Sequence, residues 1–199
     1  MKLWRCDVCN HVFEGDLPPE TCPVCQVGKE HFKEEEPKEH KPVSNMKKAT
    51  RSMSYGLYVV CSRLGDKLNG QVSNAAFQVT TNPTTLAISV NQSNLTRECI
   101  DDTGFFTLNI LGTTNQRLVR RFGFRSGREF DKFKNMKYGL TDNQIPYLEE
   151  AAGWIECRII PDKTIEIGTH KIYVADVLDG DLLQEQMEPM TYDYYRKNK

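Results

Sequence analysis

Four cysteines near the N-terminus constrain the fold of this 199-residue chain more than any other feature. They form two Cys-x-x-Cys pairs, Cys6/Cys9 and Cys22/Cys25, separated by twelve residues. A two-residue gap lets both sulfurs of a pair face one ion, so two pairs can supply the four ligands of a tetrahedral metal site. Two disulfides, or thiol redox chemistry, are the alternatives. Because neither a secretory signal nor a βαβ pattern surrounds the pairs, we predict a metal site.

The sulfur ligands alone do not decide between iron and zinc. Residues 1–33 are too few to bury a sufficient core, so the metal is expected to serve as the core of this module. Trp4, Gly15, the Pro18-Pro19 pair and Phe32 flank the cysteines. In this pattern the segment resembles rubredoxin, in particular the short-spaced form that ends the rubrerythrins. The resemblance implies one iron that cycles between the ferric and ferrous states.

The segment departs from rubredoxin at the residue that follows each cysteine pair. Rubredoxins usually have Gly there, because the turn needs a positive φ. Here the residues are Asn10 and Gln26; Asn enters the left-handed region more readily than Gln. Zinc ribbons share the architecture and vary more freely at this position, so the segment by itself leaves zinc open.

The charge balance argues against nucleic-acid binding. The formal net charge is −1 and the sequence pI is about 6.4, whereas nucleic-acid-binding domains are strongly basic. No apolar run approaches the length of a membrane span, and none follows the first residues as a secretory signal would require. Cys61, Cys99 and Cys157 are scattered single thiols, which fit a reducing compartment. We therefore predict a cytoplasmic protein with no nucleic-acid or membrane partner.

Residues 34–45 are predicted to link the metal module, residues 1–33, to a second domain, residues 46–199. The segment is charged, contains Pro37 and Pro42 and has almost no apolar side chain, which is typical of a semi-extended linker. Residues 1–45 carry six Lys/Arg and nine Asp/Glu, a net charge of −3, and the remainder has a net charge of +2. This acidity indicates either a docking surface or only a solvated linker.

The second domain is predicted to be mainly β, with a few short helices. Turn signals lie at Gly65–Gly70, Asn82-Pro83 and residues 123–127. The predicted strands cover residues 55–62, 71–80, 86–90, 105–111, 152–160, 164–167 and 171–178. Many short strands with turns between them favour an antiparallel barrel over a doubly wound sheet.

Two helices are expected between these strands. Ser93 or Asn94 can cap a helix that continues to residue 102, and a short basic helix is expected over residues 115–122. Hydroxyl groups and free N–H groups at the start of the first helix can bind an anion. Small residues nearby, in the segment 72–80, would let a flat ring lie against the backbone. A β edge with ordinary helix caps explains the same residues without any ligand.

The order of these segments resembles that of the flavin reductase family, over most of residues 50–195. The residues that carry the resemblance are Asn69-Gly70, Asn74–Phe77, Asn82-Pro83, Ser89–Asn91, Leu108–Leu111 and Gly168–Val177. The resemblance implies an FMN-binding split β-barrel that is normally a homodimer.

The same resemblance assigns the cofactor contacts. It places the flavin ring against Ser73, Asn74, Ala75 and Ala76, with Gln78 and Val79 nearby. It places the phosphate near Ser93, Asn94 and Thr96, with Arg125 and Ser126 arriving from the loop after the basic helix, and Asn91 completes the cofactor-binding set. An Arg suits a phosphate because its planar fork binds two oxygens.

His170 falls where the family's His lines the nicotinamide side, so we expect it to position the nicotinamide; a purely structural His is the alternative. Tyr192, Tyr194 and Tyr195 are expected either to cover a partner subunit's site or to form a packed or frayed tail.

The two modules together favour iron over zinc. A nicotinamide delivers two electrons as a hydride, a rubredoxin iron accepts one at a time, and a flavin handles both. The whole chain resembles the high-molecular-weight rubredoxins of anaerobic bacteria. This implies electron transfer from NADH or NADPH through FMN and iron to an acceptor such as a flavodiiron O2 or NO reductase.

Two other functions remain open at this point. The protein could be a flavin reductase that supplies reduced flavin to a partner oxygenase, with a structural zinc ribbon used for docking. It could also be a non-enzymatic zinc ribbon for docking, attached to a flavin-storing barrel.

Overall fold

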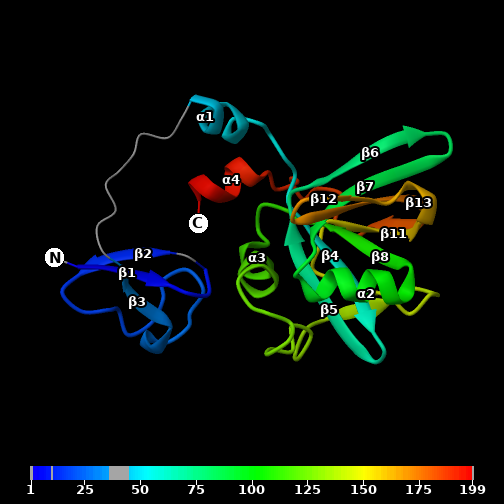
Figure 1. The fold of residues 1–199 in the computed structure, drawn as a ribbon. Coiled ribbons are helices and arrows are strands. Elements are labelled where there is room, and N and C mark those ends of the chain that lie inside the picture. The colour runs from blue at the N-terminus through cyan, green and yellow to red at the C-terminus, as the bar shows by residue number, and fades with distance from the viewer. Residues whose placement is uncertain (1, 10, 36–44, 199) are drawn as a thin grey trace. The chain divides into compact units, whose positions relative to one another are not determined.

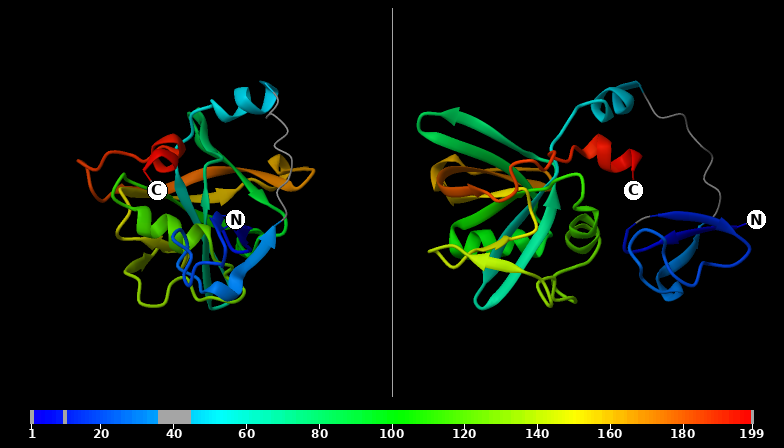
Figure 2. Two further views of the ribbon diagram at one scale, coloured as in Figure 1. Left: turned by 90° about the vertical axis from the view of Figure 1, so that its left-hand side faces the viewer. Right: turned by 180° about the vertical axis from the view of Figure 1, so that it is seen from behind.

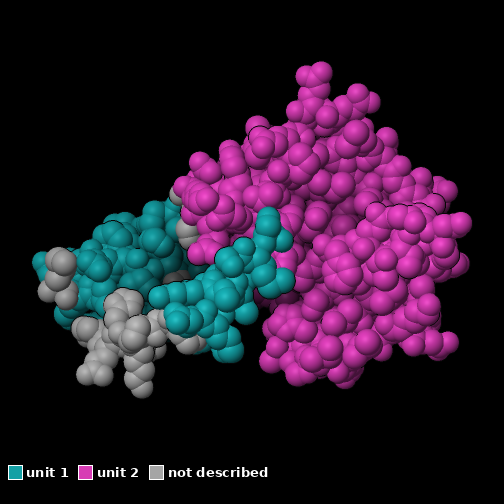
Figure 3. All heavy atoms as spheres, turned by 90° about the horizontal axis from the view of Figure 1, so that it is seen from above, with its two compact units in different colours: residues 1–54 teal, residues 55–199 magenta. Residues whose placement is uncertain are grey.

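The computed structural model describes residues 2–9, 11–35 and 45–198. The chain divides into two compact units, Met1–Ser54 and Tyr55–Lys199, which Figure 3 colours separately.

The first unit contains a small antiparallel sheet of three strands in the order β2-β1-β3 (Figure 1). Its strands are β1 (Lys2–Cys6), β2 (Val12–Gly15) and β3 (Phe32–Glu35), and a 3-10 turn, Lys29–His31, precedes β3. The Trp4 indole N–H donates to the Gly15 carbonyl at 3.1 Å, and Phe32 is buried. Helix α1 (Asn45–Arg51) also belongs to this unit, and its residues are exposed.

Strand β3 reaches into the segment predicted as a linker. Glu34 lies opposite Trp4 in the sheet and forms an ion pair with Lys2 at 2.9 Å. Glu35 lies opposite Leu3 and accepts a 2.7 Å hydrogen bond from Arg5. The ordered module therefore runs two residues beyond residue 33. Residues 36–44 of the predicted linker lie outside the described residues, and the domain boundaries stay a prediction.

The second unit is built on an eight-stranded sheet in which every pairing is antiparallel (Figures 1 and 2). The strand order is β5-β4-β8-β11-β13-β7-β6, and β12 pairs with β13. The strands are β4 (Tyr58–Leu64), β5 (Lys67–Ser73), β6 (Ala76–Thr81), β7 (Thr84–Asn91), β8 (Phe105–Ile110), β11 (Gly153–Ile159), β12 (Ile165–Ile167) and β13 (His170–Leu182). The predicted mainly β fold class is confirmed.

Strand β4 is buried on both faces, as its continuous apolar run predicts. Val59 and Cys61 belong to one core cluster, with helix α3 (Gln116–Gly123), and Val60 belongs to a second cluster. The second cluster includes Ile100 of helix α2 (Leu95–Thr103) and the large buried ring of Tyr173. β4 therefore separates two apolar layers, one covered by α3 and one by α2.

Two sequence predictions about β5 and β6 are wrong. The turn predicted at Gly65–Gly70 is much tighter, because Leu64 pairs with Lys67 and only Gly65 (φ 55°) and the next residue lie outside the strands. The single strand predicted over residues 71–80 is two strands. They are separated where the Ala75 N–H donates to the Ser73 hydroxyl at 3.2 Å, a local bond that bends the chain.

Helix α1 was not predicted from the sequence, and neither were a hairpin and a helix of the second unit. A separate hairpin is formed by β9 (Tyr138–Leu140) and β10 (Pro146–Leu148). The C-terminal segment forms helix α4 (Tyr192–Lys197), whose Thr191 hydroxyl accepts the Tyr194 N–H. Tyr195 is buried with Met190 in the cluster that contains α3, so the tail packs on its own barrel at this residue.

Among the described residues, no helix combines the length and the apolar character needed to span a membrane.

Candidate metal centre and flavin site

The structure brings the four predicted metal ligands together. The Sγ atoms of Cys6, Cys9, Cys22 and Cys25 all lie within 4.8 Å of one another. The Cys6–Cys25 and Cys9–Cys22 Sγ pairs are 3.6 Å and 3.5 Å apart. A tetrahedron with metal–sulfur bonds of about 2.3 Å has edges of about 3.8 Å. All four thiols are unbridged, and the set fits one tetrahedral ion.

Backbone N–H groups of the turns point at these sulfurs. Burial alone would raise the pKa of Cys22, but hydrogen bonds from the N–H groups of Cys25 and Val24 bring it below its usual value. Burial raises the pKa of Cys25 to about 11 against an opposing bond from the Val27 N–H. Such donors favour the thiolate, which is the form that binds metal. Cys9 is only partly buried, whereas the other three ligands are buried.

The turn after the second cysteine pair has the positive φ angle that is expected at this position of a rubredoxin-like module. Gln26 has φ 65°, and its N–H donates to the Cys22 carbonyl at 3.0 Å. The predicted positive φ is therefore confirmed at a non-Gly residue. Asn10, at the matching position of the first pair, lies outside the described residues.

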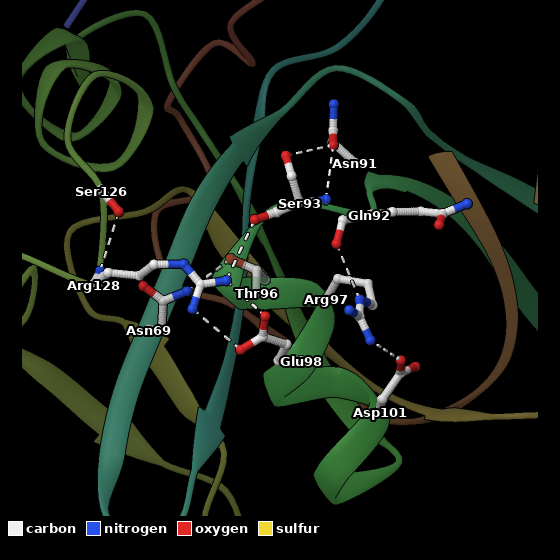
Figure 4. A network of polar contacts seen from close by, with 10 residues as sticks. All are labelled: Asn69, Asn91, Gln92, Ser93, Thr96, Arg97, Glu98, Asp101, Ser126 and Arg128. Carbon is white, nitrogen blue, oxygen red and sulfur yellow. Dashed lines mark hydrogen bonds and ion pairs between the residues drawn. The ribbon is translucent and has the colours of Figure 1, made fainter. Parts of the chain in front are cut away.

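The second site lies at the start of α2, where polar side chains converge (Figure 4). The Asn91 Oδ1 atom accepts the Ser93 N–H at 2.9 Å and the Ser93 hydroxyl at 2.8 Å. Asn94 occupies the N-cap position, but its side chain donates to Gln71 Oε1 at 2.9 Å. The predicted side-chain cap is therefore wrong for Asn94, and the first N–H groups of α2 have no side-chain cap. An uncapped helix start favours an anion.

The loop 124–131 reaches this helix start through Arg128, a residue that was not among the predicted ligands. Its guanidinium lies 3.4 Å from the Ser93 carbonyl and 2.6 Å from Glu98 Oε1. The backbone N–H of Arg128 donates to the hydroxyl of the predicted residue Ser126. The hydrogen bond from Arg128 holds the pKa of Glu98 below its usual value. Arg125 instead lies 4.4 Å from the ring centre of Phe130.

Buried polar groups lie beneath the same helix start. Asn69 donates to the hydroxyl of the predicted residue Thr96 at 2.8 Å, and both residues are almost fully buried. The Asn69 Oδ1 atom has no hydrogen-bond partner among the described residues. A Cβ atom at Gly127 would clash with this Oδ1 atom, so glycine allows the loop to approach β5 closely. The unpaired Asn69 Oδ1 atom and the close approach of the loop at Gly127 fit a site that is completed by a polar group of a ligand.

The residues predicted to contact the flavin ring form a bend and an edge strand. Ser73 is buried at the end of β5, and Asn74, Ala75 and Ala76 are half-buried. The Ala75 carbonyl accepts the Ser89 N–H of β7 at 2.9 Å, which holds the bend beside that strand. Gln78 and Val79 lie further along β6 and are exposed. Their assignment to the flavin site stays a prediction.

His170 lies next to this region. It pairs with Asn91 across β13 and β7, so its register brings it to the start of the loop before α2. Its Nδ1 atom lies 2.8 Å from the Thr169 hydroxyl, and the Gln92 N–H donates to the Thr169 carbonyl at 2.9 Å. His170 is exposed, and its orientation is therefore set by a neighbouring hydroxyl rather than by burial.

The comparisons with known proteins agree with this fold and with the presence of two domains. The chain matches the family described as flavin reductase like domain over residues 50–199, and the rubrerythrin, rubredoxin-like domain over residues 4–33. High molecular weight rubredoxin of Moorella thermoacetica is 40% identical over 154 residues, which cover 76% of this chain and 66% of that protein. The matched part thus spans about two thirds of that relative.

Two further likenesses concern the barrel. Ferric-chelate reductase (NAD(P)H) of Archaeoglobus fulgidus is 33% identical over 150 residues, which cover 74% of this chain and 87% of that protein. The structure of the flavin reductase HpaC complexed with NADP+ matches with a TM-score of 0.65 at 22% identity, over 74% of this chain and 90% of that chain. At this identity the structural match shows the shared fold alone.

The chain belongs to the flavin-reductase-like family, a family of NAD(P)H-dependent oxidoreductases, and it also carries a rubredoxin-like domain. Domains of these two kinds bind a flavin and an iron ion, and the four convergent thiols fit the iron. High molecular weight rubredoxin of Moorella thermoacetica is one of the proteins to which the chain is homologous.

Proposed function

We propose that this protein oxidises NADH or NADPH through bound FMN and passes single electrons to a four-cysteine iron centre and then to an acceptor protein. The observation that carries the proposal is the presence, in one chain, of four convergent thiols and a flavin-reductase-like barrel. When bound, a flavin accepts two electrons from a nicotinamide and releases them one at a time, as a single iron requires. A covalent link also raises the local concentration of the iron module at the flavin to about millimolar.

Each set of residues has a role in this proposal. The four cysteines would hold the iron, and the start of α2, with Ser93, Asn94 and Arg128, would bind the flavin phosphate. The bend at Ser73–Ala76 would accept the flavin ring against its backbone. His170 would position the nicotinamide, and no proton transfer by this side chain is needed for hydride transfer. Arg128 supports the assignment because an arginine fork suits a phosphate and this one lies 3.4 Å from the Ser93 carbonyl.

We also infer that two copies of the chain pair through the edge strand β6. This strand ends the sheet order, and Phe77 and Val79 on it are 64% and 46% exposed. The β6–β7 hairpin projects away from α2 and α3 (Figures 1 and 2). An exposed apolar edge strand favours pairing with another chain unless it is covered.

Cytoplasmic residence would fit the buried free thiols Cys61, Cys99 and Cys157.

An absorption spectrum and an anaerobic titration with NADH or NADPH test the electron route. We expect a red iron centre and a yellow flavin in the purified protein, and both should bleach when the nicotinamide is added. The variant Cys9→Ser should lose electron delivery to an acceptor such as a flavodiiron O2 or NO reductase and keep reduction of the flavin. The matched variant Cys99→Ala alters a buried thiol outside the tetrad and should keep both activities.

The opposite results would point to the other functions. Protein that lacks the red iron colour, contains stoichiometric zinc and keeps a yellow, reducible flavin would indicate a flavin reductase with a structural zinc ribbon. An iron centre that stays oxidised while the flavin bleaches would refute the relay. Protein without a yellow chromophore would contradict a flavin enzyme altogether.

A further inference from the structure

The loop 124–131, which carries Ser126 and Arg128, is tied together at its two ends by reciprocal hydrogen bonds. From the α3 side, the Arg121 Nε atom donates to the Lys132 carbonyl at 2.6 Å, and its guanidinium also donates to the Lys134 carbonyl. From the other side, the Lys132 Nζ atom donates to the Phe122 carbonyl at 3.1 Å. We call this pair of side chains, Arg121 and Lys132, the clasp.

The clasp also fixes the loop to the sheet. The Lys132 Nζ atom donates to the Gly70 carbonyl of β5 at 2.8 Å, and Gly70 directly follows Asn69. Lys132 is only 5% exposed, so its ammonium group is removed from water. A buried ammonium is costly unless it is well bonded, and here two carbonyl groups accept from it. A buried ammonium group points to a role beyond packing, because an apolar residue would fill the same space at a lower cost in folding free energy.

The held loop contacts the helix start that forms the candidate phosphate site (Figure 4). Arg128 reaches the Ser93 carbonyl and Glu98 of α2, and Gly127 packs on the Asn69 amide. All of these contacts depend on a loop whose ends stay together, because a displacement of about 1 Å is enough to weaken a hydrogen bond to an anion.

We propose that Arg121 and Lys132 are positioning residues for the flavin phosphate: the clasp holds Ser126 and Arg128 at the start of α2 without touching the cofactor. This inference rests on the proposed function, since it requires a flavin whose phosphate binds there. It predicts that the clasp acts on FMN, which has the phosphate, and not on riboflavin, which has the same ring and lacks it.

The test compares the dissociation constants of FMN and riboflavin for the full-length, flavin-free chain, measured by quenching of flavin fluorescence. In Lys132→Met we expect the FMN constant to rise at least about tenfold and the riboflavin constant to change by less than about twofold. Arg121→Gln should act in the same direction and removes no buried charge. Arg120→Gln is the matched control, because Arg120 is an exposed arginine on the same helix. Circular dichroism melting curves identify a variant that fails to fold, in which case Arg121→Gln decides.

The outcomes separate the inference from the function on which it rests. A wild-type chain that binds neither flavin would overturn the proposed function. A wild-type chain that binds FMN and riboflavin equally would overturn the phosphate site and the clasp with it. If the wild type prefers FMN and both clasp variants keep that preference, the clasp is only structural and the inference is wrong.

Discussion

Lys132 places a titratable group where water cannot reach it. Burial lowers the pKa of this ammonium group to about 8, from an ordinary value of 10.5. The nearby Cys61 thiol acts in the opposite direction and raises the pKa of Lys132 slightly against the effect of burial. Burial also acts on Cys61 itself, and there it raises the pKa of the thiol. Between about pH 8 and pH 10.5 the Lys132 site therefore holds fewer protons in the folded protein than in the unfolded chain.

We predict that Lys132 makes the free energy of unfolding increase with pH from about pH 8 to pH 10.5. Below this window the folded state must bury a charged ammonium, and the cost disappears as the group loses its proton. The full change is about 3 kcal/mol. Urea unfolding of the wild type and of Lys132→Met should show a stability difference that shifts in favour of the wild type as pH rises. A difference that is constant with pH would contradict the lowered pKa.

The site residues differ in whether the sequence alone could predict them. The metal ligands could be predicted because two-residue spacing restricts the sulfurs to one ion. The segment Arg125-Ser126-Gly127-Arg128 offered two arginines, and the sequence does not say which one turns toward α2. In the structure Arg125 stacks on Phe130, and Arg128 reaches Ser93. The sequence did not indicate a role for Lys132, because the burial of a lysine depends on segments that lie far away in the sequence.

At the scale of elements, apolar runs predicted most of the sheet. The structure confirms strands close to the predicted positions for β7, β8, β11 and β12. The errors lie where a local bond or a tight turn decides, as at Ser73 and Gly65. The β9–β10 hairpin could not be predicted, because its residues are held by distant partners: the Thr107 hydroxyl donates to the Pro146 carbonyl, and the Leu148 N–H donates to Asn109.

The packing of α3 on β5 predicts a destabilising substitution. A Cβ atom at Gly70 would lie 2.9 Å from Cys61 Sγ and 3.0 Å from a Phe122 ring carbon, which is too close for a packed core. Gly70→Ala should therefore lower the free energy of unfolding by about 1–3 kcal/mol. Gly123→Ala is the matched control, since its Cβ would lie 3.4 Å from Val72 and should change stability by less than about 1 kcal/mol. Equal stabilities of the two variants in urea would show that the core yields at Gly70.

For the whole molecule, the edge strand β6 predicts the oligomeric state. Phe77→Glu places a carboxylate on the exposed apolar edge and should weaken the dimer at least about a hundredfold, because an interface would have to bury an unpaired charge. Light scattering coupled to size exclusion should show a dimeric wild type and a monomeric variant. Leu140→Glu changes a similarly exposed apolar residue on β9 and should remain dimeric. A monomeric wild type, or a dimeric Phe77→Glu, would contradict pairing through β6.

The cysteines of the barrel have a practical consequence for work with this protein. Cys61, Cys99 and Cys157 are fully buried, and burial raises the pKa of each thiol, that of Cys99 to about 11. An alkylating reagent should therefore react with them only after the barrel opens. Loss of the ion should open the metal module, because the ion is expected to form the core of that module, and should free the tetrad thiols. In the native protein, the mass added by iodoacetamide then reports on chains whose tetrad has lost its ion, and it measures how completely a preparation is loaded.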